Sequence, residues 1–203
     1  MSRKAYFNGV ASSWDEKYYS PTLAAFLEDL VPKFGLKEGQ NILDLGTGTG
    51  LLIPFLLSVV GPSGSVVAVD YAEKMVEICR SKYSHLKNVK VVLQDAEELN
   101  FPSGSFDAVT CFGLFPHLEN KDKALRHMNR VLKPGGKLVI AHALSSAEIK
   151  AHHNNAEEAV VNDELPEEPE MKRLLKRAGF VVNTLVDKSG CYLCMATKPL
   201  KKF

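Results

Sequence analysis

The sequence predicts an α/β fold in which a mostly parallel sheet is covered by helices on both faces. Two observations carry this prediction. The apolar segments that resemble strands are continuous runs such as Val66-Val67-Ala68-Val69, which is typical of strands buried on both faces. These runs also alternate along the chain with segments of helical periodicity, as the crossover connections of a parallel sheet require.

Each expected element follows from the local pattern of apolar residues and from the prolines and glycines that interrupt or end it. Strands are expected over residues 41–45, 65–70, 89–93, 106–112 and 137–143. Helices are expected over residues 49–60, 72–83 and 121–132. Pro54 falls inside the first of these helices, where it would introduce a kink. Residues 133–136, Lys-Pro-Gly-Gly, are expected to stop the third helix in a tight turn.

The pattern changes after residue 143. Residues 145–158 are polar and residues 162–170 are acidic with two prolines, whereas 171–178 resemble a helix. Strands over residues 180–186 and 192–197 have a connection short enough for an antiparallel hairpin. We therefore expect one domain with four parts: an N-terminal cap segment (1–35), a cofactor-binding core (36–143), a polar insert or lid (144–178) and C-terminal hairpin strands (179–203). The aromatic-rich residues 6–19 either pin the N-terminus to the core or cap a pocket.

Composition argues against several functional classes. The 203 residues include 25 Lys and Arg against 24 Asp and Glu, so no strong basic field attracts nucleic acid. The longest apolar run, residues 51–60, contains a proline and is too short to span a membrane. The four cysteines suggest no disulfide framework, which favours a cytoplasmic protein. Cys191 and Cys194 form a CxxC pattern, but on a strand they would face opposite sides of the sheet.

A glycine loop joins the first expected strand to the first helix. Gly46, Gly48 and Gly50 leave backbone N–H groups bare for a ligand at a helix N-terminus. A dinucleotide loop, G-x-G-x-x-G, would require glycine where Leu51 stands, and Asp44 would repel a pyrophosphate. A cationic or zwitterionic nucleoside fits better, because Asp44 would pair with an amino group and a second acid, Asp70, would accept both ribose hydroxyls.

Five motifs together resemble one enzyme family in order and spacing. They are Asp44-Leu45-Gly46-Thr47-Gly48-Thr49-Gly50, the acid of Val69-Asp70, Gln94-Asp95-Ala96, Phe106-Asp107-Ala108-Val109 and Leu132-Lys133-Pro134-Gly135-Gly136. The chain resembles the class I S-adenosylmethionine-dependent methyltransferases, most of all the branch that contains the ubiquinone/menaquinone C-methyltransferases, over residues 41–143. The resemblance implies a Rossmann-like seven-stranded sheet with an antiparallel last strand, S-adenosyl-L-methionine as cofactor, and methyl transfer to an acceptor.

The resemblance also implies which residues contact the cofactor. The methionine part is expected against Asp44, Gly46, Thr47, Gly48 and Gly50. The ribose is expected on Asp70, and the adenine beside Tyr71, Met75, Asp95 and Ala96. Cys111 and Phe112 are expected to form the floor of the sulfonium site. Asp95 has a structural alternative, since it would cap a short helix over residues 96–99.

The end of the fourth strand bears on the acceptor. Methylases of amino groups on bases usually carry Asn/Asp-Pro-Pro-Tyr there, whereas this chain continues Cys111-Phe112-Gly113-Leu114. A small-molecule acceptor is therefore expected. His117 and His142, which follow the ends of the fourth and fifth strands, are candidate catalytic residues.

A histidine-rich segment leaves a second function open. If residues 145–158 are helical, Glu148 and His152 share a face and, with His142, would hold a divalent metal or orient an acidic acceptor. A solvated polar helix explains the same pattern. Two alternatives to a methyltransferase therefore stay open. The first is a cofactor-binding sensor or metal-binding module on the same fold. The second is an NAD-dependent oxidoreductase, which Leu51 and Asp44 disfavour.

Overall fold

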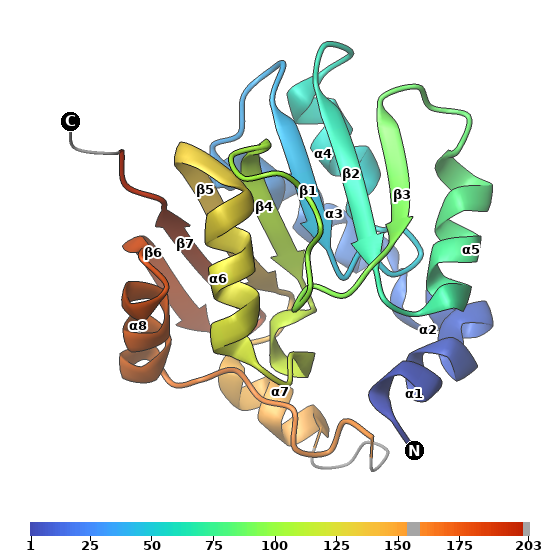
Figure 1. Ribbon diagram of the computed structural model, residues 1–203. Helices are drawn as coiled ribbons and strands as arrows, with labels where there is room; N and C mark the ends of the chain where they lie inside the picture. Colours follow the sequence, from blue (N-terminus) through green and yellow to red (C-terminus); the bar gives the residue numbers. More distant parts are fainter. Residues whose placement is uncertain (154–158, 201–203) are drawn as a thin grey trace.

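The computed structural model describes residues 1–153 and 159–200, and its centre is a seven-stranded sheet (Figure 1). The strand order is β3-β2-β1-β4-β5-β7-β6. The strands are β1 (Asn41–Leu45), β2 (Ser65–Asp70), β3 (Val89–Leu93), β4 (Phe106–Phe112), β5 (Leu132–His142), β6 (Val181–Lys188) and β7 (Cys191–Thr197). β1 to β5 pair in parallel, whereas β7 is antiparallel to both β5 and β6. The predicted fold class and the antiparallel hairpin are confirmed.

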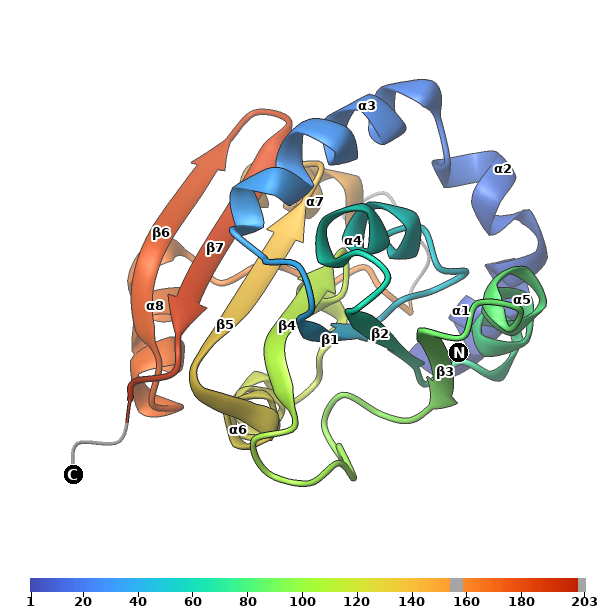
Figure 2. The same ribbon diagram turned by 90° about the horizontal axis from the view of Figure 1, so that it is seen from above.

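Helices cover both faces of this sheet (Figure 2). The α-helices are α1 (Arg3–Val10), α2 (Trp14–Tyr18), α3 (Pro21–Leu30), α4 (Ile53–Val60), α5 (Glu73–Tyr83), α6 (Lys121–Val131), α7 (Ser146–His153) and α8 (Glu168–Arg177). Single 3-10 turns are η1 (Ala11–Ser13), η2 (Val31–Phe34) and η3 (Phe115–His117). Buried side chains of α3, α4 and α5 form a core on one face, and those of α6, α7 and α8 a core on the other.

Alternation along each strand divides its side chains between these two cores. On β1, Ile42 packs toward α3 and α4, whereas Leu43 and Leu45 pack toward α6. The two cysteines of β7 divide in the same way, since Cys191 packs against the first core and Cys194 belongs to the second. All four cysteines are free. The CxxC pattern is therefore a consequence of strand packing.

The first predicted helix begins four residues late. Residues 46–52 form turns, and α4 starts at Ile53 with Pro54 in its first turn. A proline there needs no N–H partner within the helix, so it starts α4 instead of kinking it. The glycine loop is consequently longer than the sequence suggested.

The predicted tight turn at residues 133–136 is instead part of β5. Leu132 pairs with Phe106 and Lys137 pairs with Ala108, so the extra residues of β5 form an irregularity in the ladder. The Gly135 N–H donates to the carbonyl of Lys198, and the Lys198 N–H donates to the carbonyl of Gly136. Lys198, the residue after β7, thus satisfies backbone groups that a free turn would expose to water.

Within residues 1–153 and 159–200, no helix combines the length and apolar character needed to cross a membrane.

Candidate functional site

The carboxyl ends of the parallel strands open into a cavity of about 520 Å³. This is the edge at which open parallel sheets place ligands. The N-terminal helices α1 and α2 lie at this edge, as does α7 (Figure 1). The cavity is lined by residues that follow β1, β2, β3, β4 and β5, so segments distant in sequence contribute to one site.

Asp44 lies at the end of β1 and is 1% exposed. Its Oδ1 accepts a hydrogen bond from the Thr110 hydroxyl at 2.7 Å, but its Oδ2 is buried and makes no hydrogen bond within the described residues. Burial raises the pKa of Asp44 to about 6, the negative charge of Asp70 adds to the rise, and the hydroxyls of Thr110 and Thr47 oppose it. An unpaired buried carboxylate oxygen is costly unless a ligand supplies a donor.

Asp70 ends β2 and faces the same cavity. Its Oδ1 accepts from the Ala72 N–H and its Oδ2 from the Gly48 N–H, each at 2.9 Å. These bonds fix the carboxylate and leave further lone pairs toward the cavity. Burial raises its pKa against the effect of both hydrogen bonds. Two neighbouring buried acids at one cavity favour a ligand that carries positive charge.

The three glycines of the loop have different surroundings, so the lack of a side chain matters for a different reason at each. Gly46 and Gly48 line the cavity, whereas Gly50 does not. A Cβ on Gly50 would lie 2.4 Å from the Tyr83 ring, so that glycine allows α5 to pack against the loop. A Cβ on Gly48 would meet nothing closer than 3.7 Å and would project beside Trp14 and Met75. Gly50 is expected from the sequence to contact the cofactor, but it packs against α5 and does not line the cavity.

The side chains expected near adenine all line the cavity. Tyr71 and Met75 come from the start of the β2–α5 connection and from α5, and Asp95 and Ala96 from the loop after β3. Asp95 makes no helix cap, because residues 96–99 are not helical. Its carboxylate accepts from the Glu97 N–H at 2.8 Å, which holds the loop in a turn.

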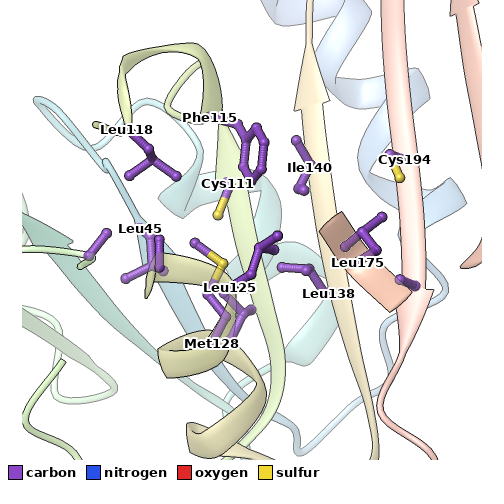
Figure 3. Close-up of a cluster of buried hydrophobic side chains, with 14 of the residues drawn as sticks. Leu45, Cys111, Phe115, Leu118, Leu125, Met128, Leu138, Ile140, Leu175 and Cys194 are labelled. Atoms are coloured by element: carbon purple, nitrogen blue, oxygen red, sulfur yellow. The ribbon is translucent and has the colours of Figure 1, made fainter. Parts of the chain in front are cut away.

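Cys111 and Phe112 are adjacent on β4 and point to opposite faces. Phe112 lines the cavity. Cys111 does not, and Figure 3 shows it with Leu125 and Met128 in the core beneath α6. Burial raises the pKa of its thiol. Cys111 is expected from the sequence to contact the sulfonium, but strand alternation turns its side chain into the core, away from the cavity.

The aromatic N-terminus forms a wall of the cavity. Phe7 of α1 and Trp14 of α2 line it, and their rings lie 5.9 Å apart in an edge-to-face contact. Asp15 fastens α2 to the glycine loop, because it accepts from the Thr49 hydroxyl at 2.5 Å and pairs with Lys82. Both roles considered for the aromatic segment fit this arrangement, since Phe7 and Trp14 line the cavity and also pack against buried residues such as Met75.

Four histidines line the cavity, namely His117, His142, His152 and His153. The Nδ1 of His142 accepts from the Leu144 N–H at 3.0 Å. Burial and the nearby histidines lower the pKa of His142 to about 4. His117 of η3 contacts a residue that the sequence did not single out, Asp163, through an Nδ1–Oδ2 distance of 2.7 Å.

Asp163 joins the two segments that flank the cavity. It is 3% exposed and accepts from Arg3 of α1, whose Nη2 lies 2.5 Å from Oδ1. It comes from the acidic segment after α7, where several other acids make it inconspicuous in the sequence. Arg3 likewise stands among ordinary N-terminal residues, so no pattern could have found this pair.

The candidate metal set does not assemble. Glu148 turns toward the β6–β7 hairpin, where it accepts from the Gly190 N–H and the Ser189 hydroxyl, at 2.9 and 2.7 Å, as well as from Ser145. Within residues 1–153 and 159–200, no three His, Cys, Asp or Glu side chains are placed to hold a metal ion. The grouping of Glu148 with His142 and His152 is therefore wrong. Residues 154–158 of the predicted polar insert lie outside the described residues.

These contacts give Glu148 a structural role, which predicts the effect of its removal. The hydrogen bonds lower its pKa to about 2. Because this pKa is depressed, the stabilisation is present above the ordinary Glu value and is lost as the pH falls toward 2. Glu148→Ala is expected to lower the melting temperature at pH 7, and the difference from wild type should shrink below about pH 4. Unchanged melting at pH 7 would contradict the assigned contacts.

Comparisons of the sequence and of the structure with known proteins both find methyltransferases. A family model described as a methyltransferase domain matches residues 43–140. The Escherichia coli ubiquinone/menaquinone biosynthesis C-methyltransferase UbiE is 39% identical over 143 residues, which cover 66% of this chain and 56% of the relative. A SAM-dependent methyltransferase from Aquifex aeolicus is 29% identical, has a TM-score of 0.75 and is matched over 92% of this chain and 97% of its own.

The chain belongs to the class I S-adenosylmethionine-dependent methyltransferases. S-adenosyl-L-methionine is the cofactor of this family. The chain spans about half the length of the curated relatives it matches, 56% for UbiE. The fold extends to more distant proteins, such as a putative Haloferax volcanii methyltransferase solved with the activator Trm112, with a TM-score of 0.76 at 19% identity over 97% of both chains.

Proposed function

We propose that this chain transfers a methyl group from S-adenosyl-L-methionine to a small-molecule acceptor. One observation carries the proposal: two buried acids, Asp44 and Asp70, face one cavity, and Asp44 Oδ2 has no hydrogen-bond partner within the described residues. The cofactor carries an amino group for the first acid and two ribose hydroxyls for the second. A dinucleotide would bring phosphates toward the same charges.

The lining residues fit the parts of this cofactor in order. Asp44 Oδ2 would accept from its amino group, and the backbone of Gly46, Thr47 and Gly48 would lie against the methionine part. Asp70 would hold the ribose, and Tyr71, Met75, Asp95 and Ala96 would surround the adenine. Phe112 would lie below the sulfonium. All of these residues line the cavity.

The bound cofactor supplies a methyl group that its positive sulfur already activates. The chain's own task is therefore to align an acceptor and to exclude water, a contribution of roughly 7–11 kcal/mol in well-oriented reactions. Phe7 and Trp14 line the cavity together with the histidines of η3, β5 and α7, and the Phe7 ring packs against the ring of His117. We propose that residues 1–35 act as a cap and residues 144–178 as a lid within one domain.

This enclosure supports a small acceptor. Arg3, which lines the cavity, binds Asp163 and so joins the proposed cap to the segment after α7. The four free cysteines support a cytoplasmic location.

The proposal is tested with cofactor labelled in its methyl group. The purified protein is incubated with labelled S-adenosylmethionine and a desalted or an undesalted cell extract. Label is expected in small molecules of the undesalted extract alone. Label that appears instead in protein or nucleic acid of the desalted extract would contradict a small-molecule acceptor.

The raised pKa of Asp44 predicts how cofactor binding depends on pH. Above about pH 6 the carboxylate is ionised and pairs with the amino group, whereas below that value it is protonated and loses the pairing. Affinity for S-adenosylhomocysteine should therefore fall up to about tenfold per unit as the pH drops below 6. Calorimetry from pH 5 to 8 measures this, and Asp44→Asn should flatten the profile. A wild-type profile as flat as that of the variant would refute the assignment.

A further inference from the structure

We propose that His117, oriented by Asp163, is the general base that takes a proton from an acceptor hydroxyl, and that the acceptor is a phenol or enol. The inference rests on the proposed function and deepens it. It concerns the histidines that line the cavity, which would contact the acceptor.

The contacts of Asp163 determine which nitrogen of His117 is free. Arg3 donates to this carboxylate through Nε at 2.9 and 3.0 Å and through Nη2 at 2.5 Å. Burial raises the pKa of Asp163, but hydrogen bonds from His117 and Arg3 outweigh burial and lower it. An ionised carboxylate only accepts, so the His117 Nδ1 must carry the proton and its Nε2 must carry the lone pair.

That lone pair belongs to a ring at the cavity wall. The His117 ring packs edge-on against Phe7, with centroids 5.1 Å apart, and at the same centroid distance from His153. Its Nε2 makes no hydrogen bond within the described residues. Burial, and to a smaller degree His153 and Arg3, lower its pKa against the effect of Asp163, so the imidazole is neutral at neutral pH.

His142 has the opposite arrangement, which separates the two candidate catalytic residues. Its Nδ1 accepts from the Leu144 N–H, so the proton lies on Nε2. In this form His142 can donate a hydrogen bond to an acceptor oxygen but cannot take its proton. The ring of Phe112 stacks on His142 with an interplanar angle of 22°. Flat rings on several sides favour a flat acceptor.

The step balances without any further reactant. His117 Nε2 takes the hydroxyl proton while the acceptor oxygen forms a bond to the methyl carbon, the carbon–sulfur bond breaks, and its electron pair remains on sulfur. The positive charge thereby moves from sulfur to the imidazolium. Asp163, 2.7 Å from the ring, stabilises that charge.

The test compares two acceptors that differ in their need for a base. Phenol is protonated at about pH 8, whereas 4-nitrophenol is already largely ionised there. His117→Gln is expected to reduce kcat/KM at least about 100-fold with phenol but less than about tenfold with 4-nitrophenol. Asp163→Asn, which alters only the positioning residue, should show the same selective loss. His85→Gln changes an exposed histidine outside the cavity and should retain wild-type rates.

Each outcome is decisive once S-adenosylhomocysteine binding by each variant is measured. Equal losses with both acceptors would show a structural role and overturn the base assignment, and Asp163→Asn supplies the comparison if His117→Gln fails to bind. Cofactor binding by wild type without methylation of either acceptor would overturn the acceptor class and leave the proposed function standing. Failure of wild type to bind the cofactor would refute the proposed function itself.

Discussion

Replacement of Asp70 by Asn is expected to weaken S-adenosylmethionine binding by about 100-fold or more. Hydrogen bonds to a charged group contribute about 1.5–3 kcal/mol each, and this carboxylate would accept two from the ribose. The amide also presents an NH₂ group to one of the two backbone N–H donors, those of Gly48 and Ala72. The substitution therefore disturbs both the ligand contact and the loop that forms the rest of the site.

Calorimetric titration of Asp70→Asn with the cofactor measures this loss. Asp107→Asn is a matched control, because Asp107 lies near the opposite end of the sheet, where it accepts from the Asn41 N–H and pairs with Lys133. The control should bind as wild type does. Asp70→Asn with wild-type affinity would show that this carboxylate does not contact the ribose.

Alanine at Gly50 should mainly reduce stability, whereas alanine at Gly48 should mainly reduce cofactor binding. At Gly50 the backbone has a φ of +94° and the new Cβ would lie 2.4 Å from Tyr83 and 3.0 Å from Cys79, so we expect the free energy of unfolding to fall by about 3 kcal/mol. At Gly48 the φ is +55° and the protein leaves room for a methyl group, so the loss should be about 1 kcal/mol. That methyl group would instead project into the cavity against the cofactor.

Urea unfolding and calorimetry with S-adenosylhomocysteine separate the two effects. Gly48→Ala should remain nearly as stable as wild type and bind at least about tenfold more weakly. Gly50→Ala should unfold at a lower urea concentration. A larger loss of stability in Gly48→Ala than in Gly50→Ala would contradict the packing described for this loop.

The sheet could be predicted closely from sequence because its signals are local. β1, β2, β3 and β4 have the predicted bounds, since each is an apolar run between polar or turn residues. The start of α4 could not be predicted in this way, because periodicity does not show that the glycine loop continues to Leu52. The start of β5 was missed because the hydrogen bonds that hold Gly135 and Gly136 come from Lys198, far along the chain.

The candidate site was predictable to the extent that strand ends specify it. Asp44, Asp70 and Phe112 all face the cavity, as do the histidines. Gly50 and Cys111 belong to the same motifs but face α5 and α6. The position of a residue in a motif does not show which way it faces in the folded chain. The ion pair of Arg3 with Asp163 joins residues 160 positions apart, so only the folded chain brings it to the site.

A crystal structure of the complex with S-adenosylhomocysteine tests the central claim most directly. We expect the ribose hydroxyls on Asp70, the amino group on Asp44 Oδ2, and the sulfur between Phe112 and His117. A ligand bound outside this cavity, or one whose ribose lies away from Asp70, would contradict it.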